Sequence, residues 1–451
     1  MTGDLPRYIP HTDEDVRAML AEVGVPDLEA LFACVPEKLR LARLLDLPSA
    51  ASEQEVWREI GALAARNAHS ESHDWFLGAG TYAHYVPAAV HALASRAEFY
   101  TAYTPYQPEI SQGTLQTIFE WQTMICALTG LDVSNASLYD GASATAEAVL
   151  LALRATRRSR VVVAAGLHPH YGDVLRTYLR ALGTRIEWLP REPDGRSAPI
   201  APALDDDTAC VVVQSPSFLG PVPDVAAAAA AAHERGALLV VVVTEALSLG
   251  LLRAPGELGA DVVCGEAQSF GVPTSFGGPA LGFLATRERF LRQLPGRLVG
   301  ETVDARGRRG FVLTLATREQ HIRREKATSN ICTNQGLCLL YATIYLSLLG
   351  RVGLRKLARI NYAKAEYLKR RVRETPGLSL PLAAPGFHEV VVGVPDSGAA
   401  ALARALEAGI VGGLDLADYE PELGPALLVC TTELASRAAI DRLVACLADR
   451  R

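Results

Sequence analysis

One continuous stretch sets the fold class of this chain: residues 224–243, which read DVAAAAAAAHERGALLVVVV. Asp224 is a typical residue to cap the start of a helix, the alanine run favours a helix, and Gly236 is typical of a helix end. Residues 238–243 are apolar throughout, as strands are when both faces of a parallel sheet are covered. A helix that leads directly into such a strand predicts one crossover of an α/β fold.

Apolar segments of strand length recur on both sides of this stretch and alternate with helical patterns. They are residues 161–164, 185–189, 210–213, 238–243, 261–264 and 281–285. This alternation predicts a mainly parallel α/β sheet. Further along, strand patterns at 389–394 and 426–430 and helical patterns at 398–408 and 436–448 predict a smaller α/β layer.

The chain begins with helical patterns that carry no strand signal. Thr12 followed by Asp15 has the spacing of a capping box, and Asp27 opens a second short amphipathic helix to Cys34. We therefore expect three regions in the chain. They are an N-terminal helical arm at 1–65, a large sheet domain at 66–325, and a linker helix with a small C-terminal domain at 326–451.

Composition narrows the class of partner. The 451 residues are 49% hydrophobic and carry a formal net charge of -6, without the basic surface that nucleic acid or anionic membrane needs. The most apolar run, 237–243, is far shorter than the ~20 residues that span a bilayer. The eight cysteines contain no Cys-x-x-Cys pair, which fits reduced thiols. We expect a cytoplasmic protein that binds small molecules and other proteins.

A charged segment precedes a long apolar one. Thr317 and Gln320 have the spacing of a capping box and predict a charged helix over 318–330 that carries Lys326. A solvated face of ion pairs and a functional lysine are both consistent with this pattern. The mostly apolar residues 331–349, which a glycine follows, predict a buried helix.

A candidate anion site lies at the start of another predicted helix. Gly141, Ala142 and Ser143 are small residues at a helix N-terminus, where free N–H groups and the helix dipole can hold a phosphate. The alternative is that Asp140 caps the helix and Gly141 only makes the turn, and Asp140 would also repel a phosphate. The sequence leaves both interpretations open.

The segment 100–113 fits neither helical nor strand periodicity. Two prolines stiffen it, and it carries the polar and aromatic residues Tyr103, Tyr106, Gln107, Glu109 and Ser111. Such a loop suits a binding site, although tyrosines that only anchor a loop would give the same pattern.

Two other segments have ligand-binding character. Residues 265–279 are rich in glycine and follow a predicted strand, where open α/β folds place ligands. His168 and His170 flank a proline, but two histidines without a third ligand do not make a metal site, and a turn explains them. We expect no metal.

Several of these segments together resemble the glycine decarboxylase P-proteins, specifically the alpha subunit of the two-subunit form. The matching runs are residues 103–113, 135–141, 268–273, 276–279, 294–297, 318–324 and 326–333. The resemblance covers nearly the whole chain. It implies a fold-type I PLP-dependent transferase-like fold with a mainly parallel seven-stranded sheet.

The resemblance also implies that the cofactor, pyridoxal phosphate (PLP), is bound by the partner beta subunit and not by this chain. In the related beta subunit a His-Lys pair follows the corresponding strand, and its lysine holds PLP covalently. This chain has Gln268-Ser269 there, and a serine cannot form that bond. Of the five lysines, Lys38, Lys326, Lys356, Lys364 and Lys369, none directly follows a predicted sheet strand. We expect no covalently bound cofactor on this chain.

A vestigial cofactor site is nevertheless implied. The family pattern has an aspartate where this chain has Glu245, near the place where active fold-type I enzymes pair a carboxylate with the pyridine nitrogen. The vestigial candidates are Gly141, Ala142, Ser143, Glu245, Gln268 and Ser269.

The implied activity belongs to a complex, expected to be a heterotetramer of two alpha and two beta subunits. In the family reaction glycine is decarboxylated and its aminomethyl group passes to the lipoyl arm of H-protein, a step of glycine catabolism. This chain would carry no catalytic residue of its own but complete its partner's site through residues 103–111, with Tyr103 as the first candidate. Two alternatives are an autonomous PLP enzyme that uses Lys326 and a purely structural or regulatory pseudoenzyme.

Overall fold

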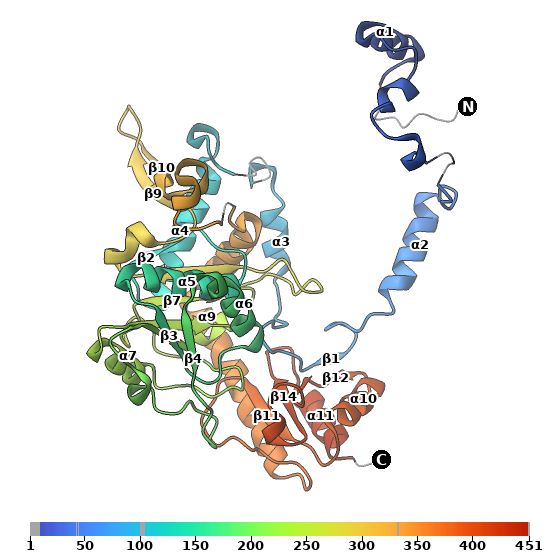
Figure 1. The fold of residues 1–451 in the computed structure, drawn as a ribbon. Helices are drawn as coiled ribbons and strands as arrows, with labels where there is room; N and C mark the ends of the chain where they lie inside the picture. The colour runs from blue at the N-terminus through green and yellow to red at the C-terminus, as the bar shows by residue number, and fades with distance from the viewer. Residues whose placement is uncertain (1–9, 42, 44, 100–103, 332, 450–451) are drawn as a thin grey trace. The chain divides into compact units, whose positions relative to one another are not determined.

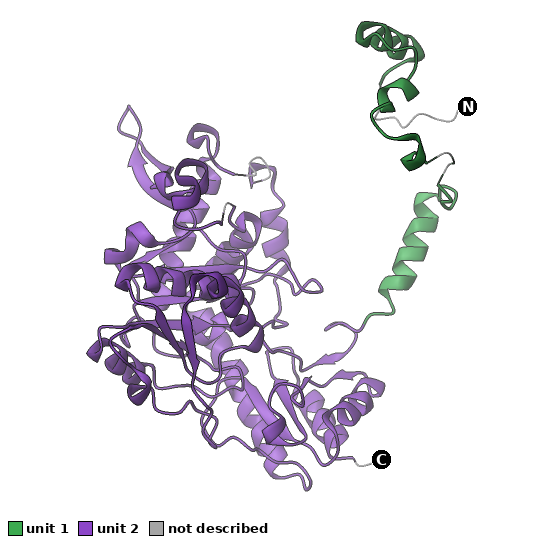
Figure 2. Ribbon diagram, in the orientation of Figure 1, with its two compact units in different colours: residues 1–67 green, residues 68–451 purple. Residues whose placement is uncertain are grey.

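The computed structural model describes residues 10–41, 43, 45–99, 104–331 and 333–449. The chain forms two compact units, Met1–Asn67 and Ala68–Arg451 (Figure 2).

The first unit is helical. Its two α-helices are α1 (Asp13–Val23) and α2 (Glu53–Ala64), and a 3-10 turn, η1 (Glu29–Phe32), lies between them. The predicted capping box is confirmed, because the Asp15 amide donates to Thr12 Oγ1 at 3.2 Å and the Thr12 amide donates to the Asp15 carboxylate at 2.8 Å. The second short helix is only the turn η1, for which Asp27 accepts the Ala30 amide at 2.9 Å. No side chain of α1 or α2 is buried.

A seven-stranded sheet forms the centre of the second unit (Figure 1). Its strands are β2 (Val133–Ser134), β3 (Arg160–Val163), β4 (Arg185–Trp188), β5 (Thr208–Gln214), β6 (Leu238–Val243), β7 (Val262–Glu266) and β8 (Gly282–Thr286). They lie in the order β2-β8-β7-β6-β5-β3-β4. Strands β3 to β7 pair in parallel, whereas β8 is antiparallel to both β7 and β2. The predicted mainly parallel sheet is confirmed.

Helices cover both faces of this sheet, which explains its unbroken apolar strands. The faces alternate along β6: Leu239, Val241 and Val243 belong to one core cluster, and Val240 and Val242 to the other. The first cluster includes residues of α4 (Gln112–Thr129), α7 (Val225–Glu234) and the start of α9 (Gly336–Arg373). The second includes residues of α5 (Gly141–Thr156) and α6 (Pro169–Leu179).

The crossover that predicts the fold is formed as expected. Asp224 accepts the Ala227 amide at 3.0 Å and caps α7, and Gly236 turns the chain at φ 66° toward β6. Each fully buried valine of β6 contributes about 1.5–3 kcal/mol relative to exposure. A charge placed on this strand would therefore have no solvated face.

The C-terminal layer also follows the sequence closely. Strands β11 (Glu389–Gly393), β14 (Ala426–Cys430) and β13 (Leu414–Asp415) form an antiparallel sheet, with helices α10 (Gly398–Glu407) and α11 (Arg437–Ala448). The strand β1 (Asp74–Trp75) pairs in parallel with β12 (Ile410–Val411). This unit also contains the helix α3 (Ala88–Ala94) and the hairpin of β9 (Leu298–Val303) and β10 (Arg309–Thr314).

The predicted charged helix over 318–330 is wrong. Its residues form three short pieces, η9 (Ala316–Arg318), α8 (Gln320–Arg323) and η10 (Arg324–Lys326). The expected capping box is absent, because Glu319 is the N-cap residue of α8 and no side chain caps that turn. Leu315 and Arg324 have φ of 55° and 51°, which a continuous right-handed helix does not allow.

The predicted apolar helix begins later and extends further than its pattern indicates. It starts at Gly336, and Gly350 interrupts it with φ 58° and ψ -179° before the helix resumes to Arg373. By length and composition it is the one helix in the described ranges that could cross a bilayer. Its first half lies in the core instead, where Leu339, Ala342 and Tyr345 are buried against the sheet.

Candidate cofactor-like site and the adjacent loop

The start of α5 is occupied by carboxylates of the chain itself. The Ser143 amide donates to Asp140 Oδ1 at 2.7 Å, so Asp140 caps the helix. The Gly141 amide donates to Glu266 Oε2 at 3.0 Å. Two of the N–H groups that a phosphate would need already donate to carboxyl groups of the chain. Ala142 is half-buried in this first turn, and the capping interpretation of the segment is the one that the structure shows.

Glu266 closes the site from the end of β7. Its Oε1 accepts the Gln268 amide at 3.0 Å and the Leu281 amide at 2.7 Å, and the side chain is buried. Burial raises the pKa of Glu266 to about 7, although the backbone donors act in the opposite direction. A Cβ on Gly141 would lie 2.1 Å from the Tyr171 hydroxyl. The start of α5 therefore has no space for an added methyl group.

Gln268 and Ser269 are both buried where the family resemblance places the partner's His-Lys pair. Gln268 holds two backbone segments of the same chain. Its Oε1 accepts the Tyr82 amide at 3.0 Å, and its Nε2 donates to the Tyr82 carbonyl at 3.1 Å and the Val272 carbonyl at 2.6 Å. This amide has the role of a structural clamp. Ser269 is only 1% exposed.

Glu245 is the centre of a buried histidine cluster. Its Oε2 lies 3.1 Å from His84 Nε2 and 3.2 Å from His388 Nε2, and its Oε1 accepts the Leu247 amide at 2.7 Å. His84 Nδ1 lies 2.8 Å from the Glu433 carboxylate. Burial opposes a charge on His84, but attraction to Glu245 and hydrogen bonds to both carboxylates raise its pKa from 6.5 to about 9. Burial also opposes ionisation of Glu245, yet the two histidines hold its pKa well below the usual range.

These residues do not fit PLP. A serine stands at the position of the lysine, Glu266 and Asp140 occupy the N-terminus of α5, and histidines already surround Glu245. The Gly141 and Ser143 amides, the Gln268 side chain and the Glu245 carboxylate each have a polar partner within the chain. The alternative that uses Lys326 is not favoured, because this lysine is exposed at the end of η10.

The loop at 104–111 contrasts with this closed site. Tyr103 lies outside the described residues. Tyr106 is 58% exposed, and Gln107 and Glu109 are exposed as well, whereas Ser111 is buried at the start of α4. Three of the four described loop candidates are thus exposed to solvent, and the fourth is buried.

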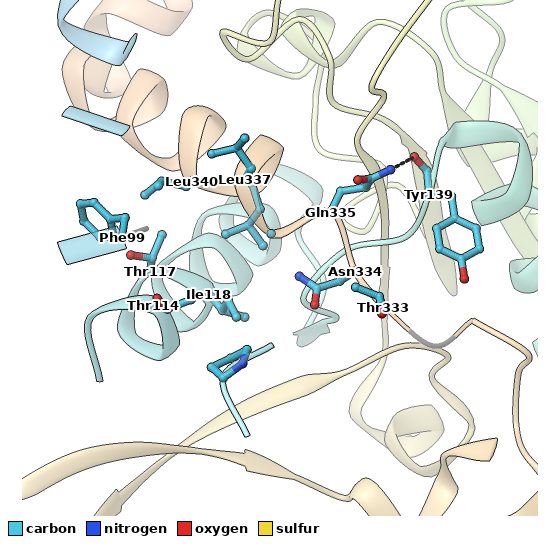
Figure 3. Close-up of a pocket in the computed structure, with 13 residues that line it drawn as sticks. Phe99, Thr114, Thr117, Ile118, Tyr139, Thr333, Asn334, Gln335, Leu337 and Leu340 are labelled. Carbon is cyan, nitrogen blue, oxygen red and sulfur yellow. Dashed lines mark hydrogen bonds between the residues drawn. The ribbon is translucent and has the colours of Figure 1, made fainter. Parts of the chain in front are cut away.

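A cavity of about 470 Å³ lies between this loop and the segment that leads into α5. Its lining includes Pro105 of the loop, Tyr139 just before α5, and Thr333, Asn334 and Gln335 at the start of α9. Figure 3 shows these polar side chains across the cavity from Ile118 of α4 and Leu337 and Leu340 of α9. Gln335 Nε2 donates to the Tyr139 carbonyl at 3.5 Å. The loop thus shares this cavity with Tyr139, two residues before the start of α5, whereas no described residue of the cofactor-like site lines it.

Several residues of this region carry no signal that sequence reasoning could use. His84 and His388 are isolated histidines 304 positions apart, and Glu266 resembles any strand end. Thr333 lies inside a matched run and Asn334 follows it directly, yet a motif does not say which of its residues line a cavity.

The fold places the chain in a class of protein. The chain is similar in structure to sphingosine-1-phosphate lyase of Burkholderia pseudomallei, with a TM-score of 0.65 at 17% identity over 92% of this chain and 93% of that one. A C-DES mutant with glycine covalently linked to the PLP cofactor gives 0.63 at 17% identity, over 87% and 99% of the two chains. The chain has the fold-type I architecture of PLP-dependent enzymes.

Sequence comparison then gives the family. The model of the glycine cleavage system P-protein matches residues 6–447, and the chain belongs to this family. It is 54% identical over 440 residues to a probable glycine dehydrogenase (decarboxylating) subunit 1 of Thermomicrobium roseum, covering 97% of this chain and 98% of that one. For the protein of the same name from Anaeromyxobacter dehalogenans, identity is 56% over 433 residues, or 95% and 96% of the two chains. A crystal structure of inhibitor-bound glycine decarboxylase (P-protein) superposes with a TM-score of 0.90 at 46% identity, over 98% and 99% of the two chains.

Proposed function

We propose that this chain is the alpha subunit of a two-subunit glycine dehydrogenase (decarboxylating). Together with a beta subunit it decarboxylates glycine and passes the aminomethyl group to the lipoyl arm of H-protein, in the cytoplasm, as a step of glycine catabolism. The observation that carries the proposal is the likeness, over nearly the whole chain, to relatives named subunit 1. The filled cofactor-like site supports the same division of labour.

The PLP of the complex belongs to the beta subunit in this proposal. PLP supplies the electron sink for the loss of CO2. This chain contributes no lysine for it and no open phosphate position, because Ser269 and Glu266 stand there. An assembly of two alpha and two beta subunits follows from the family resemblance.

The share of this chain is to complete the site of its partner. Tyr106, Gln107 and Glu109 are exposed on one stiff loop beside a cavity, so a facing subunit can contact them. Polar groups held in this way orient a substrate and exclude water at little entropic cost. Tyr103, which precedes them, is the first candidate for direct contact.

Reconstitution tests the proposal. The chain alone, the beta subunit alone and the two together are assayed for exchange of the glycine carboxyl carbon with H-protein present, all at one PLP concentration. We expect exchange only from the two subunits together. Exchange by this chain alone would contradict the proposal, and full exchange by the beta subunit alone would favour a purely structural or regulatory role.

A further inference from the structure

Arg297 is the last residue of the matched run 294–297, and it is a buried cation without a role in the proposed function. It is only 3% exposed. Within the described ranges it forms no ion pair with a carboxylate, although buried arginines are normally paired. Its Nε has no hydrogen-bond partner among the described residues, and its polar contacts are made by the two Nη groups.

The backbone around Arg297 is held firmly. Asn135 Nδ2 donates to the Pro295 carbonyl at 3.0 Å, and the Ala136 amide donates to the Arg297 carbonyl at 2.9 Å. Arg318 donates to the carbonyls of Leu294 and Gly296. Gly296 itself has φ 78°, which favours glycine at this turn. The chain thus fixes the point from which the Arg297 side chain extends.

The guanidinium of Arg297 contacts the exposed loop. Its Nη2 donates to the Tyr106 hydroxyl at 2.9 Å, and its Nη1 donates to Thr104 Oγ1 at 3.3 Å. The guanidinium carbon lies 5.2 Å from the centre of the Tyr106 ring, within cation–π range. Nη1 also lies 3.5 Å from Asn334 Oδ1, at the wall of the cavity. One planar group thereby joins the loop to the start of α9.

The rest of the loop has a separate attachment. Gln112 Nε2 donates to the Pro108 carbonyl at 2.7 Å and to the Phe311 carbonyl at 2.9 Å, and holds the end nearest α4. Between Thr104 and Tyr106 the hydrogen bond inside the loop runs from the Tyr106 amide to the Thr104 carbonyl, at 2.8 Å. Among the described residues, Arg297 is the side chain whose hydrogen bonds tie Thr104 and Tyr106 to the body of the unit.

We propose that Arg297 is a positioning residue for the proposed reaction. It holds Thr104 and Tyr106 in the conformation in which the loop enters the partner's site, and it acts through them without touching the reacting atoms. A lysine cannot replace it, because only the planar fork of a guanidinium reaches several acceptors and stacks on a ring at once. The inference rests on the proposed function, since it assumes that this loop reaches the partner.

The test compares Arg297→Lys with Arg292→Gln in the assembled complex. Arg292 is an exposed arginine of η8 (Glu288–Gln293), five positions away, and serves as the matched control. For Arg297→Lys we expect kcat of the glycine exchange to fall on the order of 100-fold, because a shift of about 1 Å in a positioning group costs that much. KM for glycine and the cofactor absorption of the partner stay unchanged, and Arg292→Gln behaves as wild type.

Amide hydrogen exchange of this chain gives a readout that does not depend on catalysis. Arg297→Lys and Tyr106→Phe are both expected to speed exchange at the amides of Thr104 and Tyr106 and to leave α4 protected. Tyr106→Phe changes an exposed side chain, so the fold is not at risk. Combining the two variants should cost little more than Arg297→Lys alone, because both break the same contact.

The inference is overturned if Arg297→Lys matches Arg292→Gln in both amide exchange and kcat, or if the losses from Arg297→Lys and Tyr106→Phe multiply independently. A wild-type complex without glycine exchange contradicts the proposed function instead. Slow exchange at the amides of Thr104 and Tyr106 in wild type, lost in Arg297→Lys, would still support the anchor in that case.

Discussion

The cofactor-like site and the loop at 104–111 differ in where their polar groups are directed. In the site, Glu245 and Glu266 are buried and bonded to partners within the chain. On the loop, Gln107 and Glu109 are exposed, and Tyr106 has one contact to the interior. Groups that are satisfied internally stabilise a fold, whereas exposed groups on a stiff loop are free to bind. The difference supports the proposal that the loop, and not the filled site, is the part of this chain that meets a partner or ligand.

The largest effect should come from breaking the histidine cluster. Glu245→Ala leaves His84 and His388 without the carboxylate between them, and removal of one partner of a buried ion pair costs about 3–5 kcal/mol of folding free energy. Urea unfolding measures the loss. The control Glu234→Ala, at an exposed end of α7, should change stability by less than about 0.5 kcal/mol. Equal stabilities for the two variants would show that the cluster is not structural.

Substitutions in the loop should lower the activity of the complex strongly without lowering the stability of this chain. The triple variant Tyr103→Phe, Gln107→Ala, Glu109→Ala is expected to lower glycine exchange by the complex on the order of 100-fold. Its unfolding midpoint should equal that of wild type, because Gln107 and Glu109 are exposed. Asp206→Asn, at a position whose side chain is 96% exposed, is the control. Unchanged turnover in the triple variant would make the loop a surface feature only.

The stability of the chain should fall as the solution becomes alkaline. The pKa of His84 is raised from 6.5 to about 9 in the folded chain, so its contribution is complete below pH 6.5 and is lost as the pH rises to about 9. Each proton that is lost in this way changes the free energy of unfolding by up to about 1.4 kcal/mol per pH unit. Urea unfolding of wild type and His84→Gln between pH 6.5 and 9.5 isolates this slope. An equal slope in both proteins would assign it to other groups.

The smallest effect is expected when a lysine is restored at the cofactor-like site: the variant should bind no PLP. Ser269→Lys supplies a lysine at the family position, but Glu266 still occupies the start of α5 and histidines still surround Glu245. We therefore expect no PLP bound to this variant after borohydride reduction and mass analysis, as in wild type. Stoichiometric labelling of residue 269 would show that the filled site opens readily.

The sequence predicts those parts of the molecule in which one local pattern determines the structure. The buried strands β6 and β14 have the predicted bounds, 238–243 and 426–430, because an apolar segment of that length has few other ways to leave water. The helix predicted for the charged segment at 318–330 is wrong, because contacts with distant residues decide the structure there. Arg318 donates to the carbonyls of Leu294 and Gly296 and does not lie on a solvated helix face.

The candidate site was predictable in its parts but not in its geometry. The exchange of lysine for serine at position 269 can be read from the chain once the family resemblance is recognised, whereas the partners of Glu245 come from positions 84 and 388. No periodicity links residues so far apart. Burial of Arg297 has the same origin, since it follows from how the turn at 294–297 packs against Asn135.

Mapping of the reduced cofactor in the assembled complex tests whether this chain is the partner without PLP. The complex is treated with borohydride, digested, and searched by mass spectrometry for lysines that carry the reduced cofactor. We predict that the label lies on one lysine of the beta subunit and on none of the five lysines of this chain. Label on Lys326, or on any other lysine of this chain, would contradict the account.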